Sequence, residues 1–314
     1  MAAKGRRHRW LRPLGLLAVV LGLSVGQPFV LIAIPFGLLS FLQPGERAFP
    51  MVLGALVLGF ALAGHESGGL WYLERGWAII VAGWFAALTL ARPARPFLPR
   101  ALLAVGGGTV WTGALLLVLD GWEHVEWMVR DRVEASAAAT MEFSRALGAG
   151  TDAAALGEAV ERTAAMQVTV FPALVALSTL AALGVAWWLH VKLSGGSDQG
   201  LAKLKNLRFA DGLIWLFIAG LGLVLVMGWT EGWGRVGSNL ILFVGALYAL
   251  RGAAVLLFLS GGVGWIGGIL IALATVFAAP VMFAGALMVG LGDTWLDLRT
   301  AATTARDGDG NQDS

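Results

Sequence analysis

A series of apolar blocks, each long enough to cross a lipid bilayer, most constrains the fold of this chain. Residues 239–260, NLILFVGALYALRGAAVLLFLS, form one such block. A helix of about 20 apolar residues crosses the hydrocarbon core, which is roughly 30 Å thick. Hydrophobic residues make up 58% of the chain and charged residues 13%, whereas soluble domains contain about 45–50% and about 25%. The sequence therefore predicts an integral membrane protein.

The apolar blocks predict an all-α fold, a polytopic transmembrane helix bundle of about eight to ten spans. Residues 14–42 are too long for one span at about 1.5 Å per residue, and a proline in their middle cannot continue the hydrogen-bond ladder. We expect two short spans there, 11–26 and 28–43, or one strongly kinked element. Residues 263–291 are interrupted by Pro280 and form one long tilted span or two short ones. The other expected spans cover about residues 49–64, 76–91, 101–119, 168–190, 212–229 and 239–260.

Residues 120–167 differ from the apolar blocks because they carry many charges, with more acids than arginines. Their apolar residues recur at helical spacing, and a Gly-Ala-Gly break precedes a second helix, capped by Thr151 or Asp152. We expect a helical hairpin outside the hydrocarbon, on the membrane surface or over the mouth of the bundle. The next span would open at Phe171-Pro172, with the proline in the first helical turn. The apolar positions of the first hairpin helix are Trp122, Val125, Val129 and Val133.

The distribution of basic residues predicts the topology of the chain. Lysine and arginine gather in segments 1–13, 92–100 and 191–208, and basic loops stay in the cytoplasm. We therefore expect a multi-pass protein of the inner (plasma) membrane with a cytoplasmic N-terminus. The predicted parts are a basic cytoplasmic N-terminus (1–13), N-terminal membrane helices (14–119), an extracytoplasmic helical hairpin (120–167), C-terminal membrane helices (168–299) and a disordered tail (300–314).

Arg251, near the middle of the 239–260 block, is the most unusual residue of the sequence. An arginine at mid-depth costs about 2.5–3.5 kcal/mol on insertion scales and more in simulations. It could contact an anion or substrate, or belong to a proton or ion path. It could instead be a structural arginine paired with a carboxylate, or reach the interface by snorkelling. The partners must come from the ends of spans: Asp120, Asp211, Glu231, Asp293 and Asp297, foremost Asp211 and the Asp293/Asp297 pair.

Tyr248 and Asn239 are the other polar candidates of this block, and we group them with Arg251 as a tentative ligand-binding set. Asn239, at the expected start of the span, suits a helix cap or an interhelical hydrogen bond. Gly245 and Gly252 are seven residues apart, and thus on one face, which predicts a close helix contact.

The acidic candidates have simpler interpretations as well. Asp211 precedes a span, where a carboxylate can cap the helix N-terminus. Asp293 and Asp297 are four residues apart, so a helix would place both on one face. That pair could hold a cation, bind Arg251, or mark an interfacial helix start.

The sequence contains no pattern typical of an enzyme. It has no Cys, which excludes disulfides, thiolate metal sites and cysteine nucleophiles. His65-Glu66 lacks the second histidine of a zinc protease, because Gly69 stands in that place. No nucleophile–base or phosphate-binding signature is present. We expect no catalytic residue, no metal site and no cofactor, and we interpret the basic loops as topological signals and not as a nucleic-acid site.

Several features in a fixed order resemble the YybS-like family of bacterial membrane proteins, a domain-of-unknown-function family (number 2232). They are a proline-interrupted first apolar pair, a span entered through Phe171-Pro172, an aspartate before the next span, Asn239…Tyr248-Ala249-Leu250-Arg251-Gly252, and Gly290-Leu291-Gly292-Asp293…Asp297-Leu298-Arg299. The resemblance covers most of residues 10–300. The family pattern commonly has an uncharged polar residue such as Gln at the position of Arg251, so the arginine is a departure.

The family's layout is similar to the substrate-binding membrane subunits of energy-coupling transporters. By fold analogy this implies an uncharacterised membrane protein that binds or transports a small solute with partner subunits. No ATPase signature is present, so an ATPase would be a separate subunit. The alternative is a non-transport scaffold or regulator that acts through the 120–167 hairpin or the 191–210 loop. The lipid bilayer is the partner common to both hypotheses.

Overall fold

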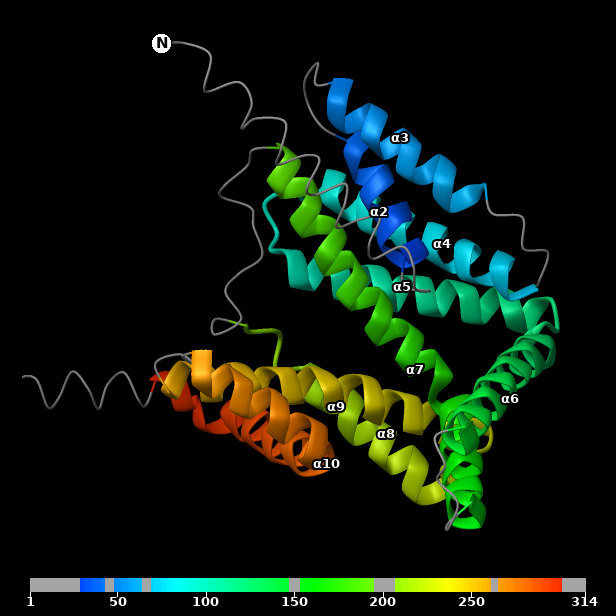
Figure 1. Ribbon diagram of the computed structural model, residues 1–314. Helices are drawn as coiled ribbons and strands as arrows, with labels where there is room; N and C mark the ends of the chain where they lie inside the picture. The colour runs from blue at the N-terminus through cyan, green and yellow to red at the C-terminus, as the bar shows by residue number, and fades with distance from the viewer. Residues whose placement is uncertain are drawn as a thin grey trace, which may run out of the picture. The chain divides into compact units, whose positions relative to one another are not determined.

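The computed structural model describes residues 29–42, 48–63, 69–146, 153–194, 207–260 and 265–300. The regular secondary structure of these ranges is helical, without strands, which confirms the predicted all-α fold. The chain forms two compact units, Met1–Leu201 and Ala202–Ser314, whose helices are labelled in Figure 1. The first of the two expected N-terminal spans, 11–26, lies outside the described residues.

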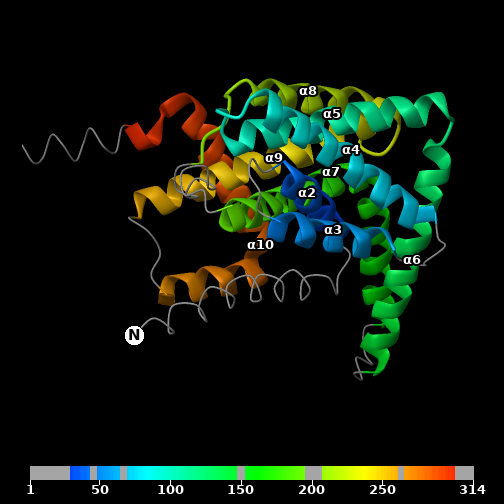
Figure 2. The same cartoon turned by 90° about the horizontal axis from the view of Figure 1, so that it is seen from above.

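The first unit is organised around α2 (Phe29–Phe41), which packs against α3 (Ala48–Leu62), α4 (Gly69–Ala91) and α7 (Ala153–Ser194). Figures 1 and 2 show α2 among these helices. This helix is apolar all round, as is typical of a helix buried on every side, and most of its residues are buried. Its 13 residues span only about 20 Å at 1.5 Å per residue. It is therefore a short core helix within its unit.

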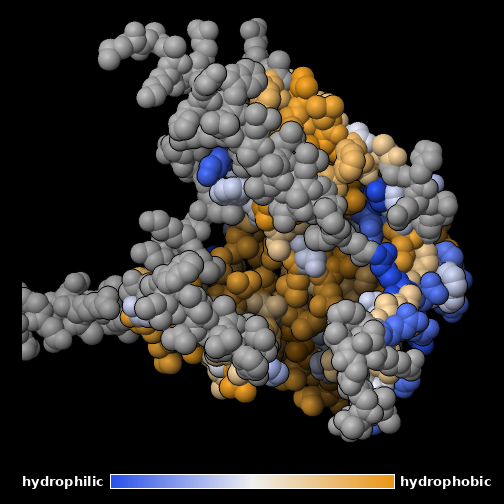
Figure 3. Space-filling model, in the orientation of Figure 1, coloured by the Kyte–Doolittle hydropathy of each residue, from blue (hydrophilic) through white to orange (hydrophobic). Residues whose placement is uncertain are grey.

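The outer helices of this unit expose apolar side chains, as expected where lipid is the solvent. On α3, Leu56 and Phe60 are 66% and 62% exposed, and Figure 3 shows hydrophobic side chains over this helix. Specific polar contacts also join the helices of this unit. The Trp77 indole of α4 donates a 2.8 Å hydrogen bond to the Thr179 hydroxyl of α7. Such bonds add to helix association where no hydrophobic force distinguishes helix from lipid.

The charged segment forms the expected helical hairpin in its described part. After α5 (Phe97–Val118), α6 (Trp122–Ala146) packs against α7. The predicted apolar stripe is confirmed in part: Val125 and Val129 are buried together with Val168 of α7, and Val133 packs against them, whereas Trp122 is 37% exposed. The proposed caps, Thr151 and Asp152, lie outside the described residues.

The prediction that Pro172 opens a span is wrong. Pro172 lies inside α7, which begins at Ala153 and continues to Ser194. Packing of α7 against α2, α5 and α6 holds the helix across the proline, and prolines are tolerated within membrane helices because neighbouring groups satisfy the freed backbone. The second hairpin helix and the following apolar span are thus one continuous helix.

The second unit places α9 (Gly232–Leu259) between α8 (Leu213–Met227) and α10 (Trp265–Leu296). Within α10, Ala278 has non-helical φ/ψ values of −130° and 30°, two residues before Pro280. Of the two arrangements left open by the sequence, the structure has two helical segments. Small residues bring the backbones together on both sides of α9. A Cβ on Gly237 would lie 2.6 Å from the Gly220 carbonyl oxygen of α8, and a Cβ on Gly252 would overlap the Ala286 carbonyl of α10.

Four helical segments of the described chain are long and apolar enough to cross a membrane: Gly69–Ala91, Phe97–Val118, Val160–Leu193 and Gly232–Leu259. Shorter apolar helices cover Phe29–Phe41, Met51–Leu62, Leu213–Met227 and Pro280–Leu296. A multi-pass membrane protein follows from these lengths, and the expected number of eight to ten spans stays a prediction.

The α9–α10 contact predicts opposite effects for two glycines of α10. In Gly290→Ala, the new methyl group would overlap the Tyr248 carbonyl, so we expect a loss of about 1–3 kcal/mol in the free energy of unfolding. Gly285→Ala is the matched control because its Cβ position is open, and the better helix propensity of alanine should leave stability equal or higher. Unfolding of purified protein in mixed detergent micelles measures both changes. Equal stability of the two variants would contradict the close contact.

Candidate functional site

Arg251 lies on the face of α9 toward the start of α8 and the end of α10. Its helix packs against both neighbours, and Arg251 is 6% exposed although it is charged. An arginine buried in a membrane protein needs charge partners, because the desolvation of a lone cation costs several kcal/mol.

Two carboxylates from distant parts of the chain hold the guanidinium group. Arg251 Nε donates a 2.8 Å hydrogen bond to Asp293 Oδ2, and Nη1 donates a 2.6 Å bond to Asp211 Oδ1. The third nitrogen, Nη2, lies 3.4 Å from the Asp293 carbonyl oxygen, near the limit of a hydrogen bond. Asp211 precedes α8, and Asp293 belongs to the last turn of α10. Of the three foremost partners expected from the sequence, the structure therefore brings Asp211 and Asp293 to Arg251.

Asp297 takes another partner. Helix α10 ends at Leu296, and Asp297 has a φ of 37°, a left-handed conformation in which aspartate is better tolerated than most residues. The chain therefore turns away from the helix, so the expectation that Asp293 and Asp297 share one helical face does not hold. Asp297 instead accepts a 3.1 Å hydrogen bond from Arg208 Nη2. The Thr300 hydroxyl bond, aided by Arg208, lowers the pKa of the exposed Asp297 carboxyl below its ordinary value.

The segment before α8, residues 207–212, is tied to the end of α10 by further bonds. Arg299 Nη2 donates to the Leu207 carbonyl oxygen at 2.9 Å and lies 3.8 Å from Asp293 Oδ2. Together with the Arg208–Asp297 pair, these contacts fix the start of the segment, and the Asp211–Arg251 pair fixes its end. We call residues 207–212 the strap.

An aromatic contact joins the strap to α9. The Phe209 and Tyr248 rings pack edge to face with centroids 5.2 Å apart, and the Arg251 guanidinium lies 5.5 Å from the Phe209 centroid. Tyr248 is fully buried, and its hydroxyl lies 3.4 Å from the Asp211 carbonyl oxygen. The tentative site residues Tyr248 and Arg251 therefore share one environment.

Asn239 does not belong to this site. It lies twelve residues before Arg251 in α9, about 18 Å along the helix axis. Its side-chain amide donates a 2.8 Å bond to the Arg235 carbonyl oxygen. The interpretation as a helix cap is wrong, because α9 begins at Gly232, upstream of the expected boundary.

The ion pairs around Arg251 form a cluster with no net charge, in which some side chains are buried and others are exposed. Its members are three arginines and three aspartates: Arg208, Arg251, Arg299, Asp211, Asp293 and Asp297. The side chains of Arg251, Arg299 and Asp293 are 7%, 5% and 1% exposed. Those of Asp211, Arg208 and Asp297 are 64%, 55% and 53% exposed. The buried layer thus holds two cations and one anion, and Asp211 on the water side supplies the remaining negative charge to Arg251.

The matching family model describes a predicted membrane protein (DUF2232) and covers residues 12–294. The chain belongs to the DUF2232 family. This confirms the resemblance inferred from the order of the sequence motifs. No curated protein and no solved structure matched the chain.

For this DUF2232 protein, sequence reasoning found the acids and Arg251 but missed the surrounding groups. The sequence places Arg208 among the charges of a basic loop and assigns no role to Arg299 or Phe209. A signal was present, because Arg208-Phe209-Ala210-Asp211 and Asp297-Leu298-Arg299 place opposite charges at the ends of two neighbouring spans. Arg100, in the first unit, was also missed as a buried residue; it is 3% exposed.

The Arg251–Asp293 pair predicts strongly coupled mutations. Arg251→Gln and Asp293→Asn should each reduce the free energy of unfolding by about 3–5 kcal/mol, since each leaves a buried charge without its main partner. The double variant should recover part of this loss, with a coupling energy of about 0.5–3 kcal/mol. Unfolding in mixed micelles measures the cycle.

The matched control for this cycle is Asp297→Asn, which removes an exposed carboxylate of the same cluster. It should change stability little, because exposed ion pairs contribute little. Additive single effects would show that Arg251 and Asp293 do not depend on each other.

Proposed function

We propose that this DUF2232 protein is a non-enzymatic, multi-pass scaffold or regulator of the bacterial plasma membrane that acts through its α6–α7 hairpin. The hairpin comprises α6 and residues 153–167 of α7. The observation that carries the proposal is the length of α7, 42 residues in one helix. At 1.5 Å per residue this is about 63 Å, twice the roughly 30 Å of hydrocarbon. The helix that spans the membrane therefore continues as a rod outside it.

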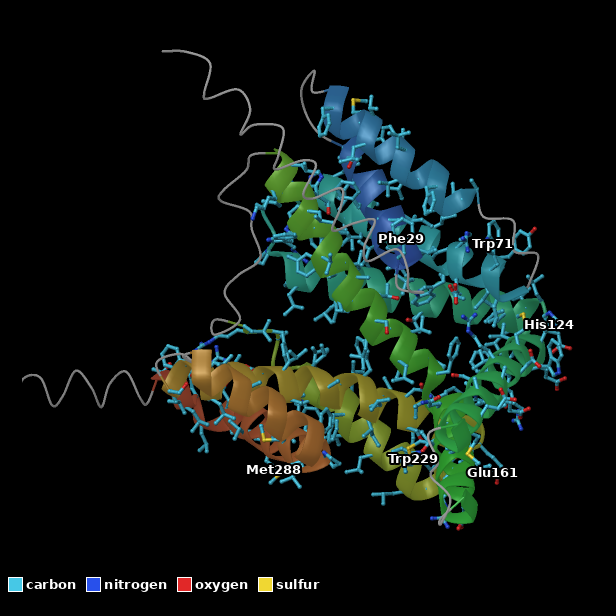
Figure 4. All side chains as sticks on the ribbon, in the orientation of Figure 1. Phe29, Trp71, His124, Glu161, Trp229 and Met288 are labelled. Carbon is cyan, nitrogen blue, oxygen red and sulfur yellow. The ribbon has the colours of Figure 1, made fainter. Side chains whose placement is uncertain are left out.

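The hairpin has the surface of an element in water. One face of α6 is buried against α7, whereas the remaining surface is charged, with hydrophilic residues over α6 in Figure 3 and His124 and Glu161 labelled in Figure 4. The exposed aromatic Trp127, 62% exposed, is of the type enriched at protein interfaces. The exposed charges are Glu123, Arg130, Asp131, Arg132, Glu134, Glu142, Glu158, Glu161 and Arg162. By the positive-inside rule this acidic hairpin lies opposite the cytoplasmic N-terminus.

The second unit supports a structural role for its charges. Arg251 has a carboxylate on each side, and the six-residue cluster sums to zero charge. An arginine that is neutralised within its own unit ties α8, α9 and α10 together, so its charge does not require a ligand.

Because the natural chain has no Cys, single-cysteine cross-linking tests the proposal. Glu161→Cys, on the exposed surface of the hairpin, is loaded with a maleimide–benzophenone in membranes and irradiated. We expect one recurrent protein adduct that is lost when Asp131 and Glu134 are both changed to Lys, because charge reversal disrupts an electrostatic interface. Gel electrophoresis and mass spectrometry identify the adduct.

Leu225→Cys is the matched control, since Leu225 is 77% exposed on the apolar helix α8. It should give lipid adducts and no recurrent protein. The same protein adduct at both positions, or none at Glu161→Cys, would contradict a partner-binding hairpin.

A second candidate function, binding of a small anionic solute with partner subunits, is favoured by one observation. Asp211 is the exposed partner of a buried Arg251, whereas Asp293 is buried. A solute carboxylate arriving from water could replace Asp211 on Nη1, where charge-assisted bonds are strong. Asp211 would then be an internal competitor of the solute.

Thermal stabilisation across a panel of small carboxylates and phosphates distinguishes this candidate. Asp211→Asn should strengthen the apparent affinity about tenfold, because it removes a charged competitor, and Arg251→Gln should abolish the response. Asp297→Asn serves as the control and should respond like the natural protein. Equal stabilisation of Arg251→Gln and the natural protein would exclude Arg251 from a solute site.

A further inference from the structure

Arg100, a buried arginine of the first unit, lies in an aromatic cage. It occupies the first turn of α5 and is 3% exposed. Its guanidinium carbon lies 4.6 Å from the Trp187 ring centroid and 5.8 Å from that of Phe85. Phe97 stacks against Trp187 at 6.4 Å and packs edge to face on Phe85 at 5.7 Å. Helices α4, α5 and α7 therefore fix the position of the cation before any ligand binds.

The described residues do not satisfy all the hydrogen-bond donors of Arg100. Nε donates to the Pro96 carbonyl oxygen at 3.3 Å, whereas Nη1 is buried without a hydrogen-bond partner in the described part of the chain. A guanidinium group has five N–H donors in a planar fork. Aromatic faces attract the charge by about 0.5–2 kcal/mol, but an oxygen acceptor is required to satisfy the buried donor.

The surrounding sequence supplies no counter-charge. Residues 76–119 and 168–194, which form most of α4, all of α5 and the apolar part of α7, contain neither Asp nor Glu. Glu74 of α4 is eleven residues before Phe85, about 17 Å along the helix. At the Arg100 end, Arg92, Arg95 and Lys192 are exposed. Among the described residues, this end of the first unit therefore carries only positive charge.

The geometry points to a binding site for a phosphate oxyanion at Arg100, supplied by the headgroup of an anionic phospholipid. Arginine binds phosphate through two parallel N–H···O bonds, and no side chain caps the N-terminus of α5, where backbone N–H groups and the helix dipole favour an anion. Arg92 and Arg95 add the exposed positive charge that attracts anionic lipids. Leu90 and Leu103, 63% and 49% exposed, give the acyl chains apolar surface nearby.

A purely structural cation would behave differently from a ligand site. If the aromatic cage alone stabilised Arg100, Arg100→Gln would lower stability equally in every lipid. In a phosphate site, the arginine stabilises the protein only when the anion is bound, because the unpaired buried cation is itself unfavourable. The dependence of the mutational effect on the lipid headgroup therefore separates the two.

The test places the protein in nanodiscs of phosphatidylcholine, with or without about 30 mol% of the anionic lipid phosphatidylglycerol. The unfolding midpoint is measured in each, and native mass spectrometry detects the retained lipids. We expect phosphatidylglycerol to raise the unfolding midpoint of the natural protein and to be retained, and Arg100→Gln to lose both effects, with at least about tenfold weaker retention. Arg162→Gln, an exposed arginine of α7 outside the basic segment, is the matched control and should keep retention within about twofold.

Two further measurements identify the source of the phosphate and keep the test valid if Arg100→Gln does not fold. Inorganic phosphate added to phosphatidylcholine nanodiscs should have no effect; an Arg100-dependent rise would assign the same site to a soluble phosphate. If Arg100→Gln does not fold, Arg100→Lys keeps the charge but loses the planar fork and should weaken phosphatidylglycerol retention severalfold. Equal retention by the natural protein and the Arg100 variants would overturn the proposal.

An internal carboxylate is the remaining alternative. Asp198 is the nearest acid after α7 along the chain and lies outside the described residues. If Asp198 neutralised Arg100, the natural protein would show no response to phosphatidylglycerol, and Asp198→Asn would create one. That result would also overturn the lipid site.

Discussion

The buried ion pair between Arg251 and Asp293 is the interaction on which the second unit depends. Its 2.8 Å bond joins the C-terminal half of α9 to the end of α10, and Asp211 extends it to the strap before α8. Taking two charges out of water gives little net stability compared with apolar packing, but breaking such a pair is costly. The pair therefore specifies which helix faces meet more than it strengthens the contact. With Asp211, the pair joins three largely apolar helices at one point.

The Arg251–Asp293 pair can form because the backbones of α9 and α10 lie close together. Gly252, the neighbour of Arg251, and Gly290, three residues before Asp293, lie against the opposite helix where a Cβ would not fit. Small residues at a helix crossing are the usual means of close packing in membranes. With larger residues there, the helices would separate and the Nε–Oδ2 bond would lengthen. Packing and electrostatics thus depend on each other at this crossing.

Arg251 and Arg100 are both buried, but their charges are stabilised in different ways. Arg251 obtains its counter-charges from within its own unit. Arg100 has aromatic rings around its charge and carboxylate-free stretches of helix beside it, residues 76–119 and 168–194, and the proposed lipid phosphate would neutralise it. The length of α7 adds a third feature, since a span continuous with the α6–α7 hairpin connects the membrane with the aqueous phase.

The sequence by itself determined the helical class, the membrane setting, the stripe of α6 and the acids that could meet Arg251. It could not decide which acids do so, where Asn239 lies in its helix, or that Arg100 is buried. In helices that are apolar on every face, periodicity does not indicate the buried side. Only the tertiary structure decided these points. The glycine crossing sets the rotation of α9 against α10, and the left-handed turn at Asp297 separates two carboxylates that a continuous helix would have kept together.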